Sequence, residues 1–141
     1  MSAPSRDTAG LAPFASEVGR VDKPWGYELV FADTEHYSGK LLFIRAGEEL
    51  SLQFHREKDE VIFVHEGRIE LAIGETPTSL RAEEVGPGQA FRFRPGTVHR
   101  WRALEDSIIL EASTPHLDDV VRLDDRYGRA EARAGDGTGQ P

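Results

Sequence analysis

Apolar and polar residues alternate in short segments along the middle of the chain. In these segments β-branched, aromatic and aliphatic side chains occupy every second position, which is the period of a strand with one buried face. The alternation predicts about eight strands, at residues 27–31, 40–46, 50–55, 60–65, 68–73, 90–94, 100–103 and 107–112. Short strands at this regular spacing favour an all-β protein, either a closed sandwich or a jelly roll.

Glycine and proline mark the turns between these segments. We expect each turn signal to join two strands, and we expect Gly67 to form a hairpin that returns residues 68–73 alongside residues 60–65. No window has a helical apolar stripe longer than two turns, so little helix is predicted. Residues 117–127 are charged with a few apolar positions, which predicts a short helix or an extended arm. The turn signals are Ala46-Gly47, Glu66-Gly67, Gly86-Pro87-Gly88 and Pro95-Gly96.

The length of 141 residues and the 38% of hydrophobic residues predict one folded domain. Residues 1–20 are rich in small residues and proline, and residues 130–141 contain almost nothing to bury. We therefore expect a flexible N-terminal segment over residues 1–20, a folded domain over residues 21–129 and a disordered tail over residues 130–141.

The composition of the chain argues against several classes of function. The chain has 25 acidic and 17 basic residues and a net charge of −8, which argues against nucleic-acid binding because that requires clustered cations. It has no cysteine, so thiol catalysis is excluded and a reducing compartment fits. No apolar run approaches the roughly 20 residues of a membrane span, and the N-terminus does not resemble a leader. We expect a cytoplasmic protein without membrane contact whose partner is a small molecule.

Four residues have the chemistry and the spacing of a metal site. Gln53 and His55 lie two positions apart in a predicted strand, so they share one face. Glu60 opens the next apolar strand, where we expect it opposite His55, and His99 follows the turn at residues 95–96. An amide oxygen, two imidazoles and a carboxylate suit Zn²⁺, with Fe²⁺, Mn²⁺ or Ni²⁺ as other candidates.

The spacing of these residues resembles that of the cupin superfamily. The run Gly47-x5-Gln53-x-His55-x4-Glu60-x6-Gly67, followed by Gly88-x5-Arg94-x-Gly96-x2-His99-x3-Ala103, is similar to its two motifs. Gln53, Arg94 and Ala103 depart from the usual residues. Gln-x-His resembles the phosphomannose isomerase branch, and residues 20–129 are similar to the cupin domain at the C-terminus of bifunctional mannose-6-phosphate isomerase enzymes.

The resemblance implies a double-stranded β-helix, or jelly-roll barrel, in which Gln53, His55, Glu60 and His99 hold zinc. It also implies a homodimer and an aldose–ketose isomerase that acts on a sugar phosphate. The inner face predicted by strand parity offers Lys40 and Glu111 as proton-transfer residues. The facing of Glu111 is open, because either Ile108 and Leu110 or Ile109 and Glu111 can form the inward set.

Candidate substrate-binding residues come from several segments. Arg94 is one of four alternating arginines that either bind an anion or form a solvated face. If His99 faces inward, Trp101 does too, as core or as the wall of a sugar site. The run Asp118-Asp119-Val120-Val121-Arg122-Leu123-Asp124-Asp125-Arg126-Tyr127-Gly128-Arg129 resembles the terminal signature of the family, which makes Arg122 and Arg129 candidates for phosphate contact.

Two other functions fit the same sequence. One carboxylate and two imidazoles also serve iron or nickel, which predicts an oxygenase as the first alternative. The second alternative is a module that binds a sugar or an acid without turnover, because the chain lacks the additional parts that larger phosphomannose isomerases use to enclose substrate.

Overall fold

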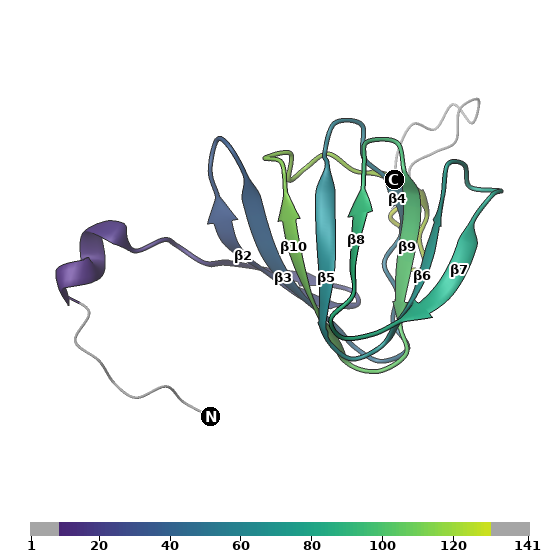
Figure 1. Cartoon of the computed structure of the whole chain (residues 1–141), viewed down its shortest axis with the longest axis horizontal. Coiled ribbons are helices and arrows are strands. Elements are labelled where there is room, and N and C mark those ends of the chain that lie inside the picture. The colour runs from purple at the N-terminus through teal and green to yellow at the C-terminus, as the bar shows by residue number, and fades with distance from the viewer. Residues whose placement is uncertain (1–8, 131–141) are drawn as a thin grey trace.

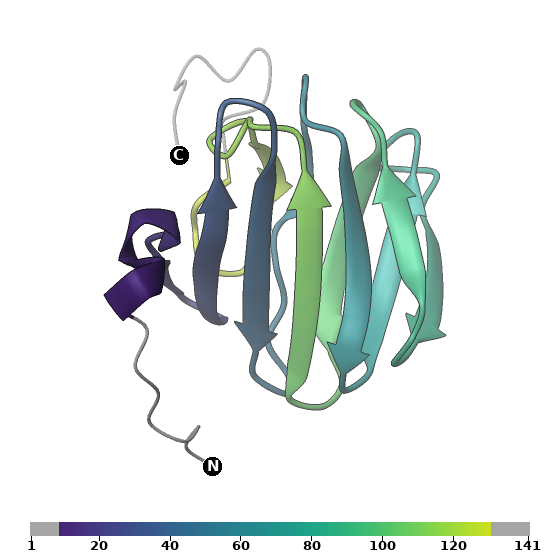
Figure 2. The ribbon, with the colours of Figure 1, turned by 60° about the vertical axis from the view of Figure 1, so that its left-hand side comes forward.

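The computed structural model describes residues 9–130, which form two antiparallel β-sheets that face each other (Figure 1). The six-stranded sheet has the order β1 (Gly19–Lys23), β2 (Gly26–Asp33), β3 (Ser38–Ile44), β10 (Ser107–Ser113), β5 (Glu60–Glu66) and β8 (Ala90–Phe93). The five-stranded sheet has the order β11 (Val121–Asp124), β4 (Leu52–Phe54), β9 (Val98–Ala103), β6 (Ile69–Gly74) and β7 (Arg81–Val85). Figure 2 shows β2, β3, β10 and β5 side by side. The predicted all-β jelly-roll architecture is confirmed.

Each predicted strand overlaps a strand of the structure, and residues 9–130 contain three more strands. β7 was not predicted because four of its five residues are exposed, so apolar and polar positions do not alternate along it. The predicted helix over residues 117–127 is wrong. That segment contains β11, which pairs with β4, so the alternative of an extended arm fits the structure.

The predicted flexible ends fall partly outside the described residues, namely at residues 1–8 and 131–141. Within the described part, residues 9–20 contain the 3₁₀ helix η1 (Ala9–Phe14) and the start of β1. No helix within residues 9–130 is long and apolar enough to cross a membrane.

The turn at Gly67 does not form the predicted hairpin. β5 pairs with β10 and β8, whereas β6 pairs with β9 and β7, so the chain crosses from one sheet to the other at Gly67. Gly67 has a φ of 93°, and a Cβ atom there would lie 2.2 Å from Oγ of Ser107. Its close packing against the loop before β10 turns the chain toward the opposite sheet.

The space between the sheets is apolar at one end and polar at the other. Inward positions on β3 run from Lys40 through Leu42 to Ile44, and those on β5 run from Glu60 through Ile62 to Val64. The apolar ends join Ile69, Phe93 and Ile109 in one core cluster. Burying each such side chain contributes about 1.5–3 kcal/mol. This core holds the strands whose opposite ends carry the polar inward residues.

Candidate metal centre

The two sheets bring the four predicted ligands to the polar end of the barrel. Gln53 lies in β4, where its register partner on β9 is His99, and His55 follows directly after β4. Glu60 begins β5 in the opposite sheet. His55, Glu60 and His99 are buried, and one potential ligand atom from each lies within 4.8 Å of the others. The proximity of His55 and Glu60 was predicted, although it arises between sheets and not between adjacent strands.

Backbone carbonyls fix which nitrogen of each imidazole faces the cluster. Nδ1 of His55 lies 2.5 Å from the carbonyl oxygen of Asp119, and Nδ1 of His99 lies 3.0 Å from that of Thr97. A carbonyl oxygen only accepts, so each Nδ1 carries the hydrogen and donates it. Nε2 of each ring therefore presents a lone pair, as in the second-shell arrangement of metal-binding histidines.

Three buried lone pairs converge on one point. Nε2 of His55, Nε2 of His99 and Oε2 of Glu60 are buried without a hydrogen-bond partner among the described residues. Nε2 of His55 is only 2.7 Å from Oε2 of Glu60. A proton shared by this pair stabilises the contact in the metal-free protein, and a divalent metal ion can take the place of that proton, so the three converging atoms fit a metal site.

The protonation states suit a metal site at neutral pH. Burial lowers the pKa of His99 to about 4, which keeps its ring neutral. Burial raises the pKa of Glu60, but the contact with His55 and the charge of Lys58 outweigh this effect and lower the pKa to about 2. Metal ligands must be a neutral imidazole and an ionised carboxylate, and the fold maintains both.

Gln53 lies beside the three clustered residues. Its Oε1 accepts a hydrogen bond of 2.8 Å from Oγ of Ser51, which orients the amide within the strand. Gln53, His55 and Glu60 line one cavity, and His99 is beside them through the pairing of β4 with β9.

The same cavity is lined by most of the other predicted site residues. Arg94 is exposed and is not among them, because its side chain lies opposite in parity to the buried Phe93. Trp101 belongs both to the core cluster and to the cavity wall, so its two alternatives are compatible. The predicted residues that line the cavity are Lys40, Gln53, His55, Glu60, Trp101, Glu111, Arg122 and Arg129.

Glu111 faces the cavity. On β10 the buried positions are Ser107, Ile109, Glu111 and Ser113, which decides between the two inward sets left open by the sequence. Burial and the charge of Glu60 raise the pKa of the Glu111 carboxyl, against the opposing charges of Lys58 and Lys40. A carboxyl with a raised pKa in a cavity is suited to accept and return a proton near neutral pH.

Two lysines each contact an acid in this cavity. Nζ of Lys58 is 2.9 Å from Oε2 of Glu111 and 3.5 Å from Oε2 of Glu60. Burial lowers the pKa of Lys58, but the two carboxylates outweigh burial and raise it, so Lys58 is a cation. Nζ of Lys40 is 3.2 Å from Oε1 of Glu28.

Four residues of the site were not predicted from the sequence. Glu28 shares the inward parity of β2, so a charged residue at that position was a usable signal. Lys23 ends a strand that was not predicted. Lys58 lies in the loop between β4 and β5, where side chains do not alternate between two faces. Asp119 forms hydrogen bonds with residues that precede it by 61 to 64 positions in the sequence. No local pattern marks either of the last two.

Comparison with known proteins agrees with this architecture. A cupin domain model matches residues 40–114. KdgF from Halomonas sp. is similar in structure, with a TM-score of 0.61 and 22% identity, over 69% of this chain and 87% of that one. BH2720 from Bacillus halodurans gives a TM-score of 0.57 and 26% identity, over 61% and 67% of the two chains.

A formate complex of oxalate decarboxylase from Lactobacillus farciminis gives a TM-score of 0.64 and 15% identity, over 75% of this chain and 33% of the enzyme. No protein of curated function is detectably similar in sequence. The cupin model covers more than half of the residues and contains the three clustered metal-binding residues, so this chain belongs to the cupin family.

Proposed function

We propose that this cupin is a metal-dependent isomerase that interconverts the aldose and ketose forms of a sugar phosphate. The observation that carries the proposal is the convergence of three buried lone pairs, from His55, Glu60 and His99, beside a cavity that also contains Glu111. A redox-inert Lewis acid held by these residues, next to a carboxyl of raised pKa, suits a proton transfer on a bound carbonyl compound.

The metal would be held by His55, Glu60, His99 and Gln53. When bound, a divalent cation supplies Lewis acidity toward the carbonyl and hydroxyl oxygens at C1 and C2 of the sugar, which makes the intervening C–H bond more acidic. The donor set favours Zn²⁺, with Fe²⁺, Mn²⁺ or Ni²⁺ as alternatives. Bacillus subtilis oxalate decarboxylase, which shares the fold, has Mn(II) centres.

Glu111 is the proposed proton carrier. Its carboxylate takes the proton from C2 of the aldose, and the electron pair forms the C1–C2 double bond of an enediolate with its negative charge on O1. The proton of the C2 hydroxyl then passes from O2 to O1, and the same carboxyl returns its proton at C1 to give the ketose with its carbonyl at C2. The ammonium of Lys58, 2.9 Å from Oε2, holds the carboxylate in place. Lys40 is the second candidate, although its contact with Glu28 occupies its ammonium. The similarity of Gln53-x-His55 to phosphomannose isomerases supports this reaction class.

The test is incubation of the zinc-loaded protein with mannose 6-phosphate in deuterated water. We expect fructose 6-phosphate and deuterium at C2 of recovered substrate. Glu111→Gln removes the proton carrier, so we expect a rate lower by about 10²–10⁴-fold with unchanged metal content. Glu105→Gln, at an exposed position, is the matched control and should keep the wild-type rate.

The proposal fails if neither product nor exchange appears across a panel of aldose and ketose phosphates. It also fails in its assignment of Glu111 if Glu111→Gln and Glu105→Gln have the same rate at equal zinc content.

One alternative enzyme is supported by the donor set. Two imidazoles and one carboxylate also form the non-haem iron site of oxygenases, and nickel can occupy the same set. Iron or nickel in natively purified protein, with oxygen consumption, would favour this alternative.

Binding without turnover is the other alternative, and it is favoured by the ion pairs in the cavity. Lys40 and Glu111 each already contact an oppositely charged group, as a structural rather than a reactive residue would. Thermal stabilisation by sugars without any product would support this alternative.

A further inference from the structure

A buried lysine lies between the metal ligands and the proposed proton carrier. Lys58 is buried, although it belongs to the loop between β4 and β5. Its Nζ atom is 2.9 Å from Oε2 of Glu111 and 3.5 Å from Oε2 of Glu60. A buried ammonium is costly unless carboxylates pair with it. These two contacts therefore explain how the interior tolerates Lys58.

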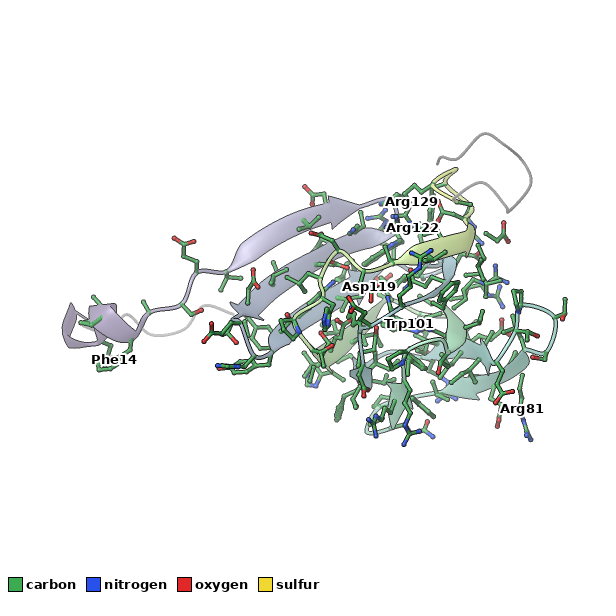
Figure 3. The ribbon with its side chains drawn as sticks, turned by 90° about the horizontal axis from the view of Figure 1, so that it is seen from above. Phe14, Arg81, Trp101, Asp119, Arg122 and Arg129 are labelled. Carbon is green, nitrogen blue, oxygen red and sulfur yellow. The ribbon has the colours of Figure 1, made fainter. Side chains whose placement is uncertain are left out.

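Hydrogen bonds fix the loop on both sides of this lysine. The backbone amide of Lys58 donates to Oδ2 of Asp119 at 2.8 Å. The amide of Asp59 donates to Oγ1 of Thr114 at 3.1 Å, and the amide of Thr114 donates to the carbonyl oxygen of Asp59 at 3.0 Å. Figure 3 shows Asp119 near the centre of the molecule in the view from above. The side chain of Lys58 therefore enters the cavity from a fixed point of the backbone.

One oxygen atom of Glu60 lies beside both Lys58 and the candidate metal site. Oε2 of Glu60 is 2.7 Å from Nε2 of His55 and is one of the three buried atoms that converge on the site. The ammonium of Lys58 is next to the same oxygen. A metal ion and an ammonium beside one oxygen repel each other, and the interior screens this repulsion only weakly. Lys58 and a metal ion therefore compete for Glu60.

Glu111 offers the ammonium a second position. Its Oε2 is already the nearer of the two carboxylate oxygens, and Glu111 is buried on the inner face of the six-stranded sheet. Lysine has a flexible four-carbon stem, so Nζ can leave Glu60 and keep its contact with Glu111 while the loop stays in place.

We propose that Lys58 is a positioning residue that competes with the metal ion for Glu60 and is left to Glu111 alone when the ion binds. In the metal-free protein the ammonium contacts both carboxylates. Loading of the metal site then also orients the carboxylate that transfers the proton. The inference rests on the proposed function, because it concerns the same metal site and the same proton carrier. It adds that Lys58 lowers the affinity for the ion and links metal occupancy to the position of Glu111.

The experiment measures the zinc affinity of the full chain by competition with a chelator of known affinity. Lys58→Met removes the ammonium and keeps the apolar stem, so we expect it to bind zinc more tightly than wild type, by about tenfold or more. Lys58→Arg keeps a cation and should bind zinc about tenfold or more weakly than Lys58→Met does. Replacement of a residue that only supported the loop would weaken zinc binding, so the direction of the change identifies the competition.

A control and a second variant complete the experiment. Arg81→Met is the matched control, because Arg81 is exposed on β7 at the far side of the molecule (Figure 3), and it should bind zinc like wild type. Lys58→Met leaves buried carboxylates without their cation, so melting curves establish that it folds. Lys58→Met combined with Glu111→Gln replaces the whole ion pair with uncharged side chains, which the interior tolerates better. This double variant should bind zinc more tightly than Glu111→Gln alone, by about tenfold or more.

The inference is overturned if folded Lys58→Met binds zinc no more tightly than wild type, or if the double variant binds it like Glu111→Gln. A crystal structure of the zinc-loaded protein in which Nζ of Lys58 still contacts Glu60 would also overturn it. Failure of the proposed function is distinct: the expected order of zinc affinities, without isomerisation of any sugar phosphate, removes only the reaction. Isomerisation by a protein whose zinc affinity does not depend on Lys58 removes only the inference.

Discussion

His99 is both a candidate ligand and a residue whose charge state contributes to stability. The ring lies 1% exposed and stacks on Phe93 with 4.1 Å between ring centroids. Such an environment disfavours the imidazolium ion, which is why the pKa falls to about 4. The fold therefore favours the neutral ring. The folded state loses stability relative to the unfolded state at any pH at which a free histidine would be protonated.

The metal-free protein should lose stability in acid, first through His99. Its folded pKa is below the ordinary value of 6.5, so the unfolded state binds protons more readily. The contribution of His99 to the free energy of unfolding is complete above the pKa of this histidine in the unfolded chain. It disappears as the pH falls toward 4. The shift corresponds to a loss on the order of 3 kcal/mol. Glu60, with a pKa of about 2 against 4.5, adds a second loss at still lower pH.

Urea unfolding at several pH values, from about pH 7.5 to about pH 5, measures the effect. His99→Gln should flatten the dependence of the unfolding free energy on pH, whereas His65→Gln, at an exposed position, should leave it unchanged. Equal slopes for wild type and His99→Gln would contradict the assignment.

At the residue scale, strand parity predicted the inward positions. It placed His99, Trp101 and Ala103 together on one face of their strand and Gln53 together with His55 on one face of theirs, and in the structure both sets face the interior. Parity does not extend into loops, so it gave no information on Lys58. Nor did it choose between Ile109 and Ile108 on β10, because both are apolar and only the opposing strands decide which side is the interior.

The C-terminal segment holds the loop that carries His55. The carboxylate of Asp119 accepts backbone hydrogen bonds from Arg56, Glu57 and Lys58, at 3.0, 2.7 and 2.8 Å. Its carbonyl oxygen accepts the hydrogen of Nδ1 of His55. Asp119 thus orders a candidate ligand through two groups of one residue.

Asp119→Ala should weaken metal binding by about 10–100-fold, because the loop and the ring of His55 lose their fixed orientation. The unfolding free energy should fall by about 1–3 kcal/mol, since amide groups lose their acceptor. Zinc titration and urea unfolding measure the two effects. Asp118→Ala changes the exposed neighbour and should match wild type. Zinc affinity in Asp119→Ala equal to that of Asp118→Ala would disprove the role.

At the element scale, strand existence was predictable but pairing was not. The glycine at position 67 correctly marked a turn, yet its direction depends on packing against Ser107, which is 40 positions later in the sequence. The extended form of residues 121–124 depends on β4 as a partner. Charged residues in that segment favour neither conformation by themselves, so only long-range contacts select the strand.

The whole molecule has an apolar arm that its own barrel does not cover. Leu11, Phe14 and Val18 are 61%, 83% and 60% exposed, and Figure 1 shows η1 projecting away from the sheets. Phe31 and Val61, on the outer face of the six-stranded sheet, are also exposed. In a twofold dimer the arm of each copy can pack on the outer sheet face of the other, because the symmetry makes the two contacts identical.

We expect a homodimer in solution, in which the arm of one copy packs on the second copy. Leu11→Ser with Phe14→Ser removes the apolar contacts and should give a monomer in multi-angle light scattering. Leu104→Ser removes an exposed apolar side chain elsewhere and should remain a dimer. A monomeric wild type, or a dimeric double variant at the same concentration, would contradict this expectation.

The contact between His55 and Asp119 also orders events during synthesis. A nascent chain that has reached residue 99 already contains all four donor side chains, but the carbonyl that orients the first imidazole is 64 residues beyond that imidazole. The ribosome must therefore release residue 119 before the donors are aligned. We therefore expect full metal affinity only after β11 has docked on β4, and a chain that stops short of residue 119 should bind an ion more weakly than the full chain does.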